Sequence, residues 1–112
     1  MLNLFLLDGN TSLLENLVAL TLLRKYGRSD AVYFYNREVE VDFYIPEVQM
    51  AIQVSYNISD SETYKREVNA LLKFANRMEV KKMLIITRDE ENRIVENGLD
   101  IKIIPIWKWL CE

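Results

Sequence analysis

Carboxylate and amide side chains on two neighbouring predicted strands are the residues of this sequence best suited to chemistry. Asp42 lies two residues after Glu40, and Gln53 lies two residues before Ser55. Because side chains alternate between the two faces of a strand, each pair shares one face, and the pairs form one cluster if those faces coincide. Hard oxygen ligands on adjacent strands suit a divalent cation such as Mg²⁺. Glu15, on a predicted helix, would complete this cluster from above the sheet.

The residue types that are missing exclude several other chemistries. The 112 residues contain no histidine, which removes Ser-His-Asp and Cys-His hydrolysis and His-ligated zinc. The single cysteine, Cys111, cannot form an internal disulfide or a cysteine-rich metal site. The three glycines, Gly9, Gly27 and Gly98, lie too far apart for a Walker-type phosphate loop. Any catalysis by this chain must therefore use carboxylates, amides, hydroxyls and lysines.

Composition and charge are typical of one globular domain. Half of the residues are hydrophobic and 28% are charged, and the length is near the mode for single domains. The net charge of −3 argues against a strongly basic nucleic-acid binder, although a local basic patch stays open. The first apolar run, residues 4–7, is too short for a signal peptide or a membrane span. We therefore expect a cytoplasmic domain that does not enter a membrane and that keeps a reduced thiol.

Hydrophobic spacing predicts a first helix over residues 12–26. Ser12 and Glu15 have the form of a capping box at its start, and Gly27 follows its end. The residues expected on its buried stripe are Leu13, Leu14, Leu17, Val18, Thr21 and Leu22.

A second helix is predicted over residues 60–77, with Ser59 and Glu62 as its capping box. Cations are concentrated in this helix and just after it: Lys65, Arg66, Lys73, Arg77, Lys81 and Lys82. Only two acids, Glu67 and Glu79, lie in the same stretch. Such a run is usually a solvated helix face, and the alternative is a phosphate-binding surface.

Six strands are predicted from period-two patterns and short apolar runs: residues 31–35, 38–45, 48–56, 83–87, 93–96 and 101–104. The core order is α-β-β-β-α-β, followed by a hairpin at Asn97-Gly98 and a short helix over residues 106–110. The strand after the second helix needs a crossover, so we expect it to lie parallel to an earlier strand in a mixed sheet. Of Trp107 and Trp109, we expect one to pack on the core and the other to face outward. The predicted class is α/β.

The candidate site residues and the order of the elements resemble those of a known family. The element order, Glu15 in the first helix, Val41-Asp42-Phe43 and Ile52-Gln53-Val54-Ser55 resemble the PD-(D/E)XK, restriction-endonuclease-like superfamily. More narrowly, residues 14–20, 40–43, 52–56 and 107–110 are similar to a domain of unknown function at the C-terminus of many bacterial and archaeal AAA-type ATPases. The resemblance spans about residues 10–112.

The resemblance implies roles for four residues. Asp42 and Gln53 take the positions of the Mg²⁺ ligands, Ser55 takes the position of the lysine, and Glu15 takes the assisting position in the helix. Gln53 offers no negative charge, so the pair would hold Mg²⁺ less well than two carboxylates. The hydroxyl of Ser55 cannot supply the charge that stabilises the scissile phosphate. A lysine of the second helix, such as Lys65 or Lys73, is the alternative source of that charge.

Each of these residues also has a structural explanation. Glu15 fits a capping box, Asp42 and Glu40 fit a solvent-facing strand, and Gln53 and Ser55 fit polar groups satisfied beside a helix. Two functions therefore compete. One is a non-catalytic accessory domain of an AAA-type ATPase, without a cofactor, which recognises nucleic acid or protein.

The other function is a Mg²⁺-dependent nuclease whose lysine has moved. Under either reading we expect the chain to be the C-terminal fragment of a longer ATPase-like protein, with the ATPase module as a partner. The apolar residues 2–7 have no obvious partner element before them, and such a segment could also promote dimerisation.

Overall fold

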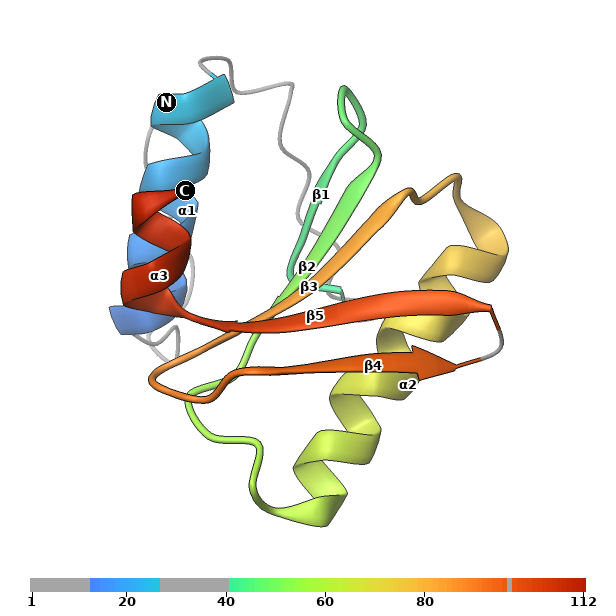
Figure 1. The fold of residues 1–112 in the computed structure, drawn as a ribbon. Coiled ribbons are helices and arrows are strands. Elements are labelled where there is room, and N and C mark those ends of the chain that lie inside the picture. The colour runs from blue at the N-terminus through green and yellow to red at the C-terminus, as the bar shows by residue number, and fades with distance from the viewer. Residues whose placement is uncertain (1–12, 27–40, 97) are drawn as a thin grey trace.

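The computed structural model describes residues 13–26, 41–96 and 98–112, which form three helices and five strands (Figure 1). In chain order the elements are α1 (Leu13–Tyr26), β1 (Phe43–Ile45), β2 (Met50–Val54), α2 (Ser61–Arg77), β3 (Lys82–Thr87), β4 (Asn92–Glu96), β5 (Leu99–Pro105) and α3 (Ile106–Cys111). The strand predicted over residues 31–35, the first part of the strand predicted over 38–45, and Glu40 lie outside the described residues.

The five strands of the described ranges form one mixed sheet in the order β1-β2-β3-β5-β4. β1 is antiparallel to β2, and β4 is antiparallel to β5. β2 and β3 are parallel, as are β3 and β5. The parallel pairing of β2 with β3 confirms the expected crossover, because α2 carries the chain from the end of one strand back to the start of the other. The protein is therefore an α/β fold with an open mixed sheet.

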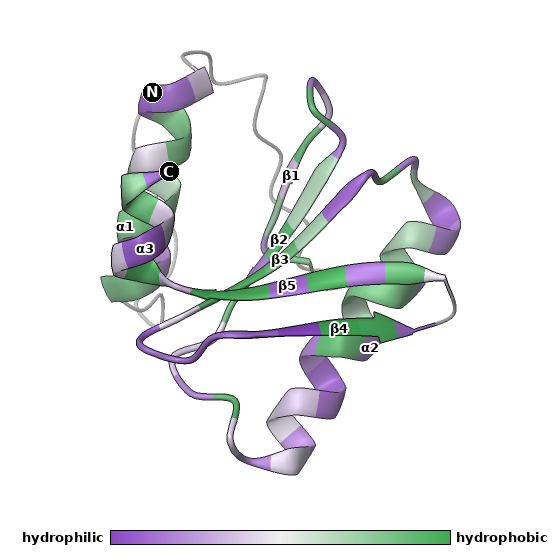
Figure 2. Ribbon diagram, in the orientation of Figure 1, coloured by the Kyte–Doolittle hydropathy of each residue, from purple (hydrophilic) through white to green (hydrophobic). Residues whose placement is uncertain are grey.

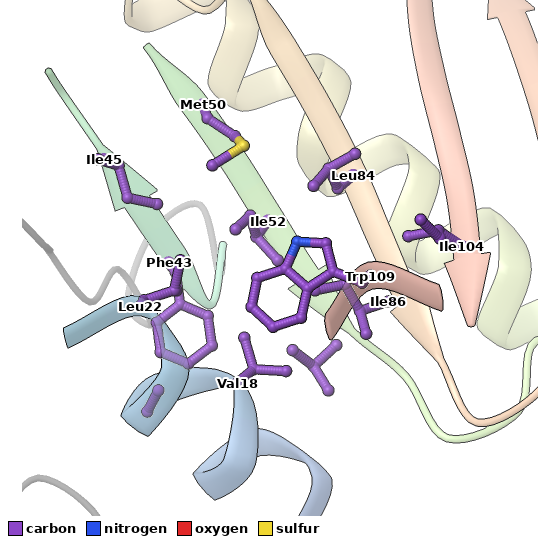
Figure 3. Close-up of a cluster of buried hydrophobic side chains, with 12 residues drawn as sticks. Val18, Leu22, Phe43, Ile45, Met50, Ile52, Leu84, Ile86, Ile104 and Trp109 are labelled. Atoms are coloured by element: carbon purple, nitrogen blue, oxygen red, sulfur yellow. The ribbon is translucent and has the colours of Figure 1, made fainter. Parts of the chain in front are cut away.

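The first face of the sheet is covered by α1 and α3, which lie side by side (Figure 1). Figure 3 shows Val18 and Leu22 of α1 and Trp109 of α3 directed at Phe43 and Ile52 of the sheet. Trp109 is buried and Trp107 is exposed, which confirms the expected division between the two tryptophans. The chain contains no described helix with both the length and the apolar character needed to cross a bilayer.

The second face of the sheet is covered by α2. Leu71 and Phe74 of α2 are fully buried against it, and the Tyr44 ring meets Phe74 edge to face with a centroid distance of 5.0 Å. Strand alternation places Tyr44 on the same face as Asp42 and Glu40, where polar neighbours would predict an exposed side chain, but Tyr44 is buried. Because α2 covers that face, Tyr44 is buried there, and its hydroxyl donates a hydrogen bond to the carbonyl of Glu79 at 2.7 Å.

The buried stripe of α1 differs from the predicted one. The residues of α1 that are buried are Val18, Ala19 and Leu22, whereas Leu13 and Leu17 are exposed. Leucines occur on every side of this helix, so apolar spacing alone does not select one face. Ser12, the predicted capping residue, lies outside the described residues.

The start of α2 is fixed by Asp60 rather than by the predicted Ser59. The carboxylate of Asp60 accepts hydrogen bonds from the backbone N–H and the hydroxyl of Thr63, both at 3.0 Å. These bonds satisfy one of the open N–H groups of the first turn and lower the pKa of the Asp60 carboxyl. The hydroxyl of Ser59 is instead directed at the side chain of Asn57.

Candidate functional site

A pocket of about 270 Å³ lies beside the start of β1 and the end of β2. Its walls come from α1, from the two strand ends and from the first half of α2, and its lining residues are Glu15, Asp42, Gln53, Val54, Arg66, Glu67 and Ala70. Three of the four predicted site residues, Glu15, Asp42 and Gln53, therefore line one pocket.

Asp42 and Gln53 hold the two strand ends together through reciprocal hydrogen bonds. The Oε1 atom of Gln53 accepts the backbone N–H of Asp42 at 2.9 Å, and the Oδ2 atom of Asp42 accepts the backbone N–H of Val54 at 2.8 Å. Regular pairing of β1 with β2 begins at the next residue, Phe43, opposite Ile52. Side-chain oxygens thus supply acceptors where the backbone ladder stops.

The burial of Gln53 follows from these bonds. Its side chain is 2% exposed, and a buried amide is stable only when its polar atoms find partners. The oxygen that would bind a metal ion already accepts a backbone hydrogen bond. Asp42 is less buried and brings negative charge to the pocket wall. Gln53 therefore has a structural function at this position, whatever else the pocket does.

Arg66 and Glu67 line the same pocket, and the sequence did not assign them to the site. The Nη2 atom of Arg66 lies 3.7 Å from Oε2 of Glu67, with the Arg66 side chain 65% exposed and the Glu67 side chain 14% exposed. Glu67 lies next to Val68 and four residues before Leu71, at the border of the buried stripe of α2. That border position was the signal that would have directed Glu67 toward the sheet.

Ser55 and the two proposed replacement lysines lie elsewhere. The hydroxyl of Ser55 is 3.5 Å from the carbonyl of Asn57, its backbone N–H donates to Ile86 at 2.9 Å, and the residue is not part of the pocket lining. Lys65 and Lys73 are exposed on α2 outside the lining. The cation beside Asp42 is thus a guanidinium, that of Arg66.

The carboxylates of the pocket do not converge on one metal position. Glu15, Asp42 and Glu67 share the lining. Within residues 13–26, 41–96 and 98–112, however, no three acidic or cysteine side chains are placed to share one ion. The pocket as it stands offers three carboxylates, a buried amide and one guanidinium around a small opening.

A larger hollow of about 610 Å³ lies over β3, β5 and β4, on the half of the first sheet face that α1 and α3 leave open. Leu84, Lys102 and Arg93 lie in one row across these strands. Arg93 and Asp100 of the lining pair with each other, whereas Glu91 pairs with Lys108 of α3 and Lys102 pairs with Glu112. The hydrogen bonds from Arg93 lower the pKa of the Asp100 carboxyl. Ion pairs therefore engage four of the charged side chains that line this hollow.

Comparison of the chain with known protein families, with curated proteins and with solved structures finds no significant match.

Proposed function

We propose that this chain is a restriction-endonuclease-like domain whose nuclease site has degenerated, and that it acts in recognition as an accessory domain of an AAA-type ATPase. The observation that carries the proposal is the pair of hydrogen bonds between Asp42 and Gln53 and the opposing strand. The two residues at the metal-ligand positions bind backbone N–H groups and join β1 to β2.

The arrangement of elements supports the proposed lineage. α1 precedes the sheet, β1 is antiparallel to β2, and β2 is parallel to the strand that follows α2. The two longest helices lie on opposite faces of the sheet. The described elements, α-β-β-α-β followed by the β4–β5 hairpin and α3, are compatible with the expected α-β-β-β-α-β core, whose first strand lies outside the described residues.

The chemistry of the pocket supports loss of catalysis. Phosphodiester hydrolysis needs a cation near the scissile phosphate and ligands that hold Mg²⁺ firmly. At the position of the lysine the chain has Ser55, whose hydroxyl is directed at a neighbouring backbone carbonyl. At the position of the second acid it has the neutral Gln53, whose oxygen is already bonded. Such a pocket can bind polar groups more readily than it can activate water.

One observation favours the second candidate, a Mg²⁺-dependent nuclease with a relocated cation. Arg66 and Glu67 of α2 line the pocket together with Asp42. In this candidate Asp42 and Glu67 would hold Mg²⁺, which would polarise the phosphate and the attacking water, and Arg66 would stabilise the negative charge that develops.

The two candidates are separated by a metal titration and a cleavage assay on the same protein. Isothermal titration with Mg²⁺ and Mn²⁺ measures ion binding, and supercoiled plasmid and branched DNA report nicking. We expect no cleavage with either metal. Asp42→Asn is the test variant, and Asp89→Asn, which removes an exposed carboxylate from the turn after β3, is the matched control.

Cleavage that Asp42→Asn abolishes and Asp89→Asn preserves would contradict the proposed loss of activity and establish the nuclease. Absence of ion binding at millimolar concentration would eliminate the nuclease, because Mg²⁺ sites of this class use carboxylates that bind the free ion weakly but measurably.

A further inference from the structure

The outward face of α2 is strongly cationic. Eight residues of this helix are exposed: Ser61, Glu62, Lys65, Arg66, Asn69, Lys73, Asn76 and Arg77. Four of them are cations and one is an acid. Since the whole chain has a net charge of −3, positive charge is segregated onto this helix. We call Lys65, Arg66, Lys73 and Arg77 the α2 cationic face.

The cations are spaced along the helix and not gathered at one point. Lys65, Asn69, Lys73 and Arg77 follow one another at intervals of four residues, so successive members are neighbours on the helix surface and the row winds gradually around the helix. At 1.5 Å per residue this row is about 18 Å long. A duplex of that length carries about ten phosphates, at one charge per 1.7 Å of its axis. The row of cations is therefore long enough to contact several phosphates of a duplex.

The acids near this face offset only part of its charge, because α2 carries four cations and two acids and one of those acids pairs with Arg66. Glu67 is mostly buried in the pocket wall beside Arg66, and the carboxylate of Glu79 accepts a hydrogen bond from the Gln49 side chain at 3.1 Å. Glu62, the one exposed acid of α2, lies in the first turn. Acids are favoured there by the helix dipole. Figure 2 shows hydrophilic residues recurring along α2.

The remaining exposed side chains of α2 indicate which part of a nucleic acid would be bound. None of its eight exposed residues is aromatic, so this face has no platform on which unpaired bases could stack. Asn69, Asn76 and Ser61 offer hydrogen-bond donors, and side chains of these types commonly contact phosphate oxygens. The chemistry suits a sugar-phosphate backbone whose bases are already paired.

We propose that the α2 cationic face binds the phosphate backbone of double-stranded DNA without reading its sequence. This inference rests on the proposed recognition function and names its partner. Arg66 belongs both to this face and to the lining of the Asp42 pocket. A backbone bound along α2 therefore passes the mouth of that pocket.

The test is the fluorescence anisotropy of a labelled duplex of about 20 base pairs, titrated with the full chain in EDTA over a range of salt concentrations. We expect the logarithm of the association constant to fall with the logarithm of salt concentration with a slope of about −3 to −4, as four released counterions require. Between about 50 and 200 mM salt the affinity then falls roughly a hundredfold.

Charge reversal identifies the surface. The double variant Lys65→Glu with Lys73→Glu should weaken binding at least tenfold and reduce the magnitude of the salt slope by about 2. The control is Arg24→Glu with Lys25→Glu in the last turn of α1, which changes the net charge of the chain by the same amount at two exposed residues. Circular dichroism checks that both variants remain folded.

Equal losses in the two double variants would overturn the proposal, because the effect would then follow net charge and not the α2 cationic face. Tighter binding of a single strand of the same length would overturn the choice of duplex. Because the binding assay contains EDTA and no metal, it tests the α2 cationic face independently of the nuclease hypothesis. Cleavage that depends on Asp42 contradicts the degenerate site and leaves the α2 result standing, whereas unaltered binding by the α2 variant contradicts only this surface.

Discussion

The helices α1 and α2 both bury one face of the sheet, but their outward surfaces are opposite in character. The outward side of α2 carries four cations, two asparagines and no exposed apolar residue. The outward side of α1 exposes Leu13, Leu17 and Leu20. Inward, the two helices are alike, since each presents a short stripe of fully or nearly fully buried apolar residues to the strands.

This difference shows that packing against a sheet constrains only the inward side of a helix. Val18 and Leu22 do for α1 what Leu71 and Phe74 do for α2, and burial of such side chains supplies most of the free energy of docking. The outward residues are free to vary without loss of this packing. The chemical type of these outward residues therefore indicates the environment that each helix faces on the side away from the sheet.

The largest expected effect is a contrast between the inward side of α2 and the outward side of α1. Phe74→Ala removes a ring that is 1% exposed and packed against Tyr44, so it should lower the free energy of unfolding by about 3–5 kcal/mol. Leu17→Ala, at a side chain that is 41% exposed, should cost less than about 1 kcal/mol. Urea unfolding followed by circular dichroism measures both. Similar losses in the two variants would show that the outward side of α1 is packed.

A second contrast tests the junction between the start of β1 and the end of β2. Gln53→Ala leaves the backbone N–H of Asp42 without its acceptor and should cost about 1–3 kcal/mol. Gln49→Ala, which removes an exposed amide contact to Glu79, is the control and should stay within about 0.5 kcal/mol. If Gln53→Ala is as mild as its control, the hydrogen bond does not hold the strand ends together.

A third change gives α1 an outward surface like that of α2. Leu17→Lys combined with Leu20→Lys should alter the free energy of unfolding by no more than about 0.5 kcal/mol per residue, since surface substitutions away from packed features are usually that mild. The variant should also stay soluble at higher concentration, because two exposed apolar side chains are replaced by charges. Strong destabilisation would mean that these leucines are buried in the protein as it exists in solution.

The smallest expected effect concerns the N-terminus of α2 and its dependence on pH. The bonds from Thr63 lower the pKa of Asp60 in the folded state, so its contribution to stability is fully present above the unfolded pKa of about 4. That contribution is lost as the pH falls through the lower folded pKa. Asp60→Asn keeps a capping side chain but has no such dependence. Urea unfolding at a series of acidic pH values should show a shallower loss for Asp60→Asn than for the unaltered chain and for Glu62→Gln, and parallel curves would contradict this account.

The sequence predicted the helices and strands whose hydrophobic patterns are clear along the chain. α2 was placed to within one residue because Val68, Leu71 and Leu72 recur at helical spacing among polar residues. β3 and the terminal helix were found in the same way, as short apolar runs with clear ends. The helix before β3 predicted that this strand lies parallel to an earlier strand, and that strand is β2.

The sequence did not reveal features that depend on how the helices pack against the sheet. A period-two pattern places Tyr44 and Gln53 on one face of the sheet, but it cannot show that α2 covers that face. The contribution of Arg66 and Glu67 to the pocket depends on where α2 crosses the strands. In α1, leucines on several sides made the buried stripe ambiguous, and Leu17 was assigned to the wrong side.

Hydrogen bonds hold both ends of α2 in place, and this determines how its surface can bind a ligand. Before the helix, the backbone N–H of Ile58 donates to the carboxylate of Glu90 at 2.7 Å. After it, the carbonyl of Gln49 accepts the backbone N–H groups of Lys81 and Lys82. With both ends held, α2 has little freedom to pivot, and the pocket wall that it forms is preorganised. Binding here would select ligands that fit an existing shape and would cost little conformational entropy.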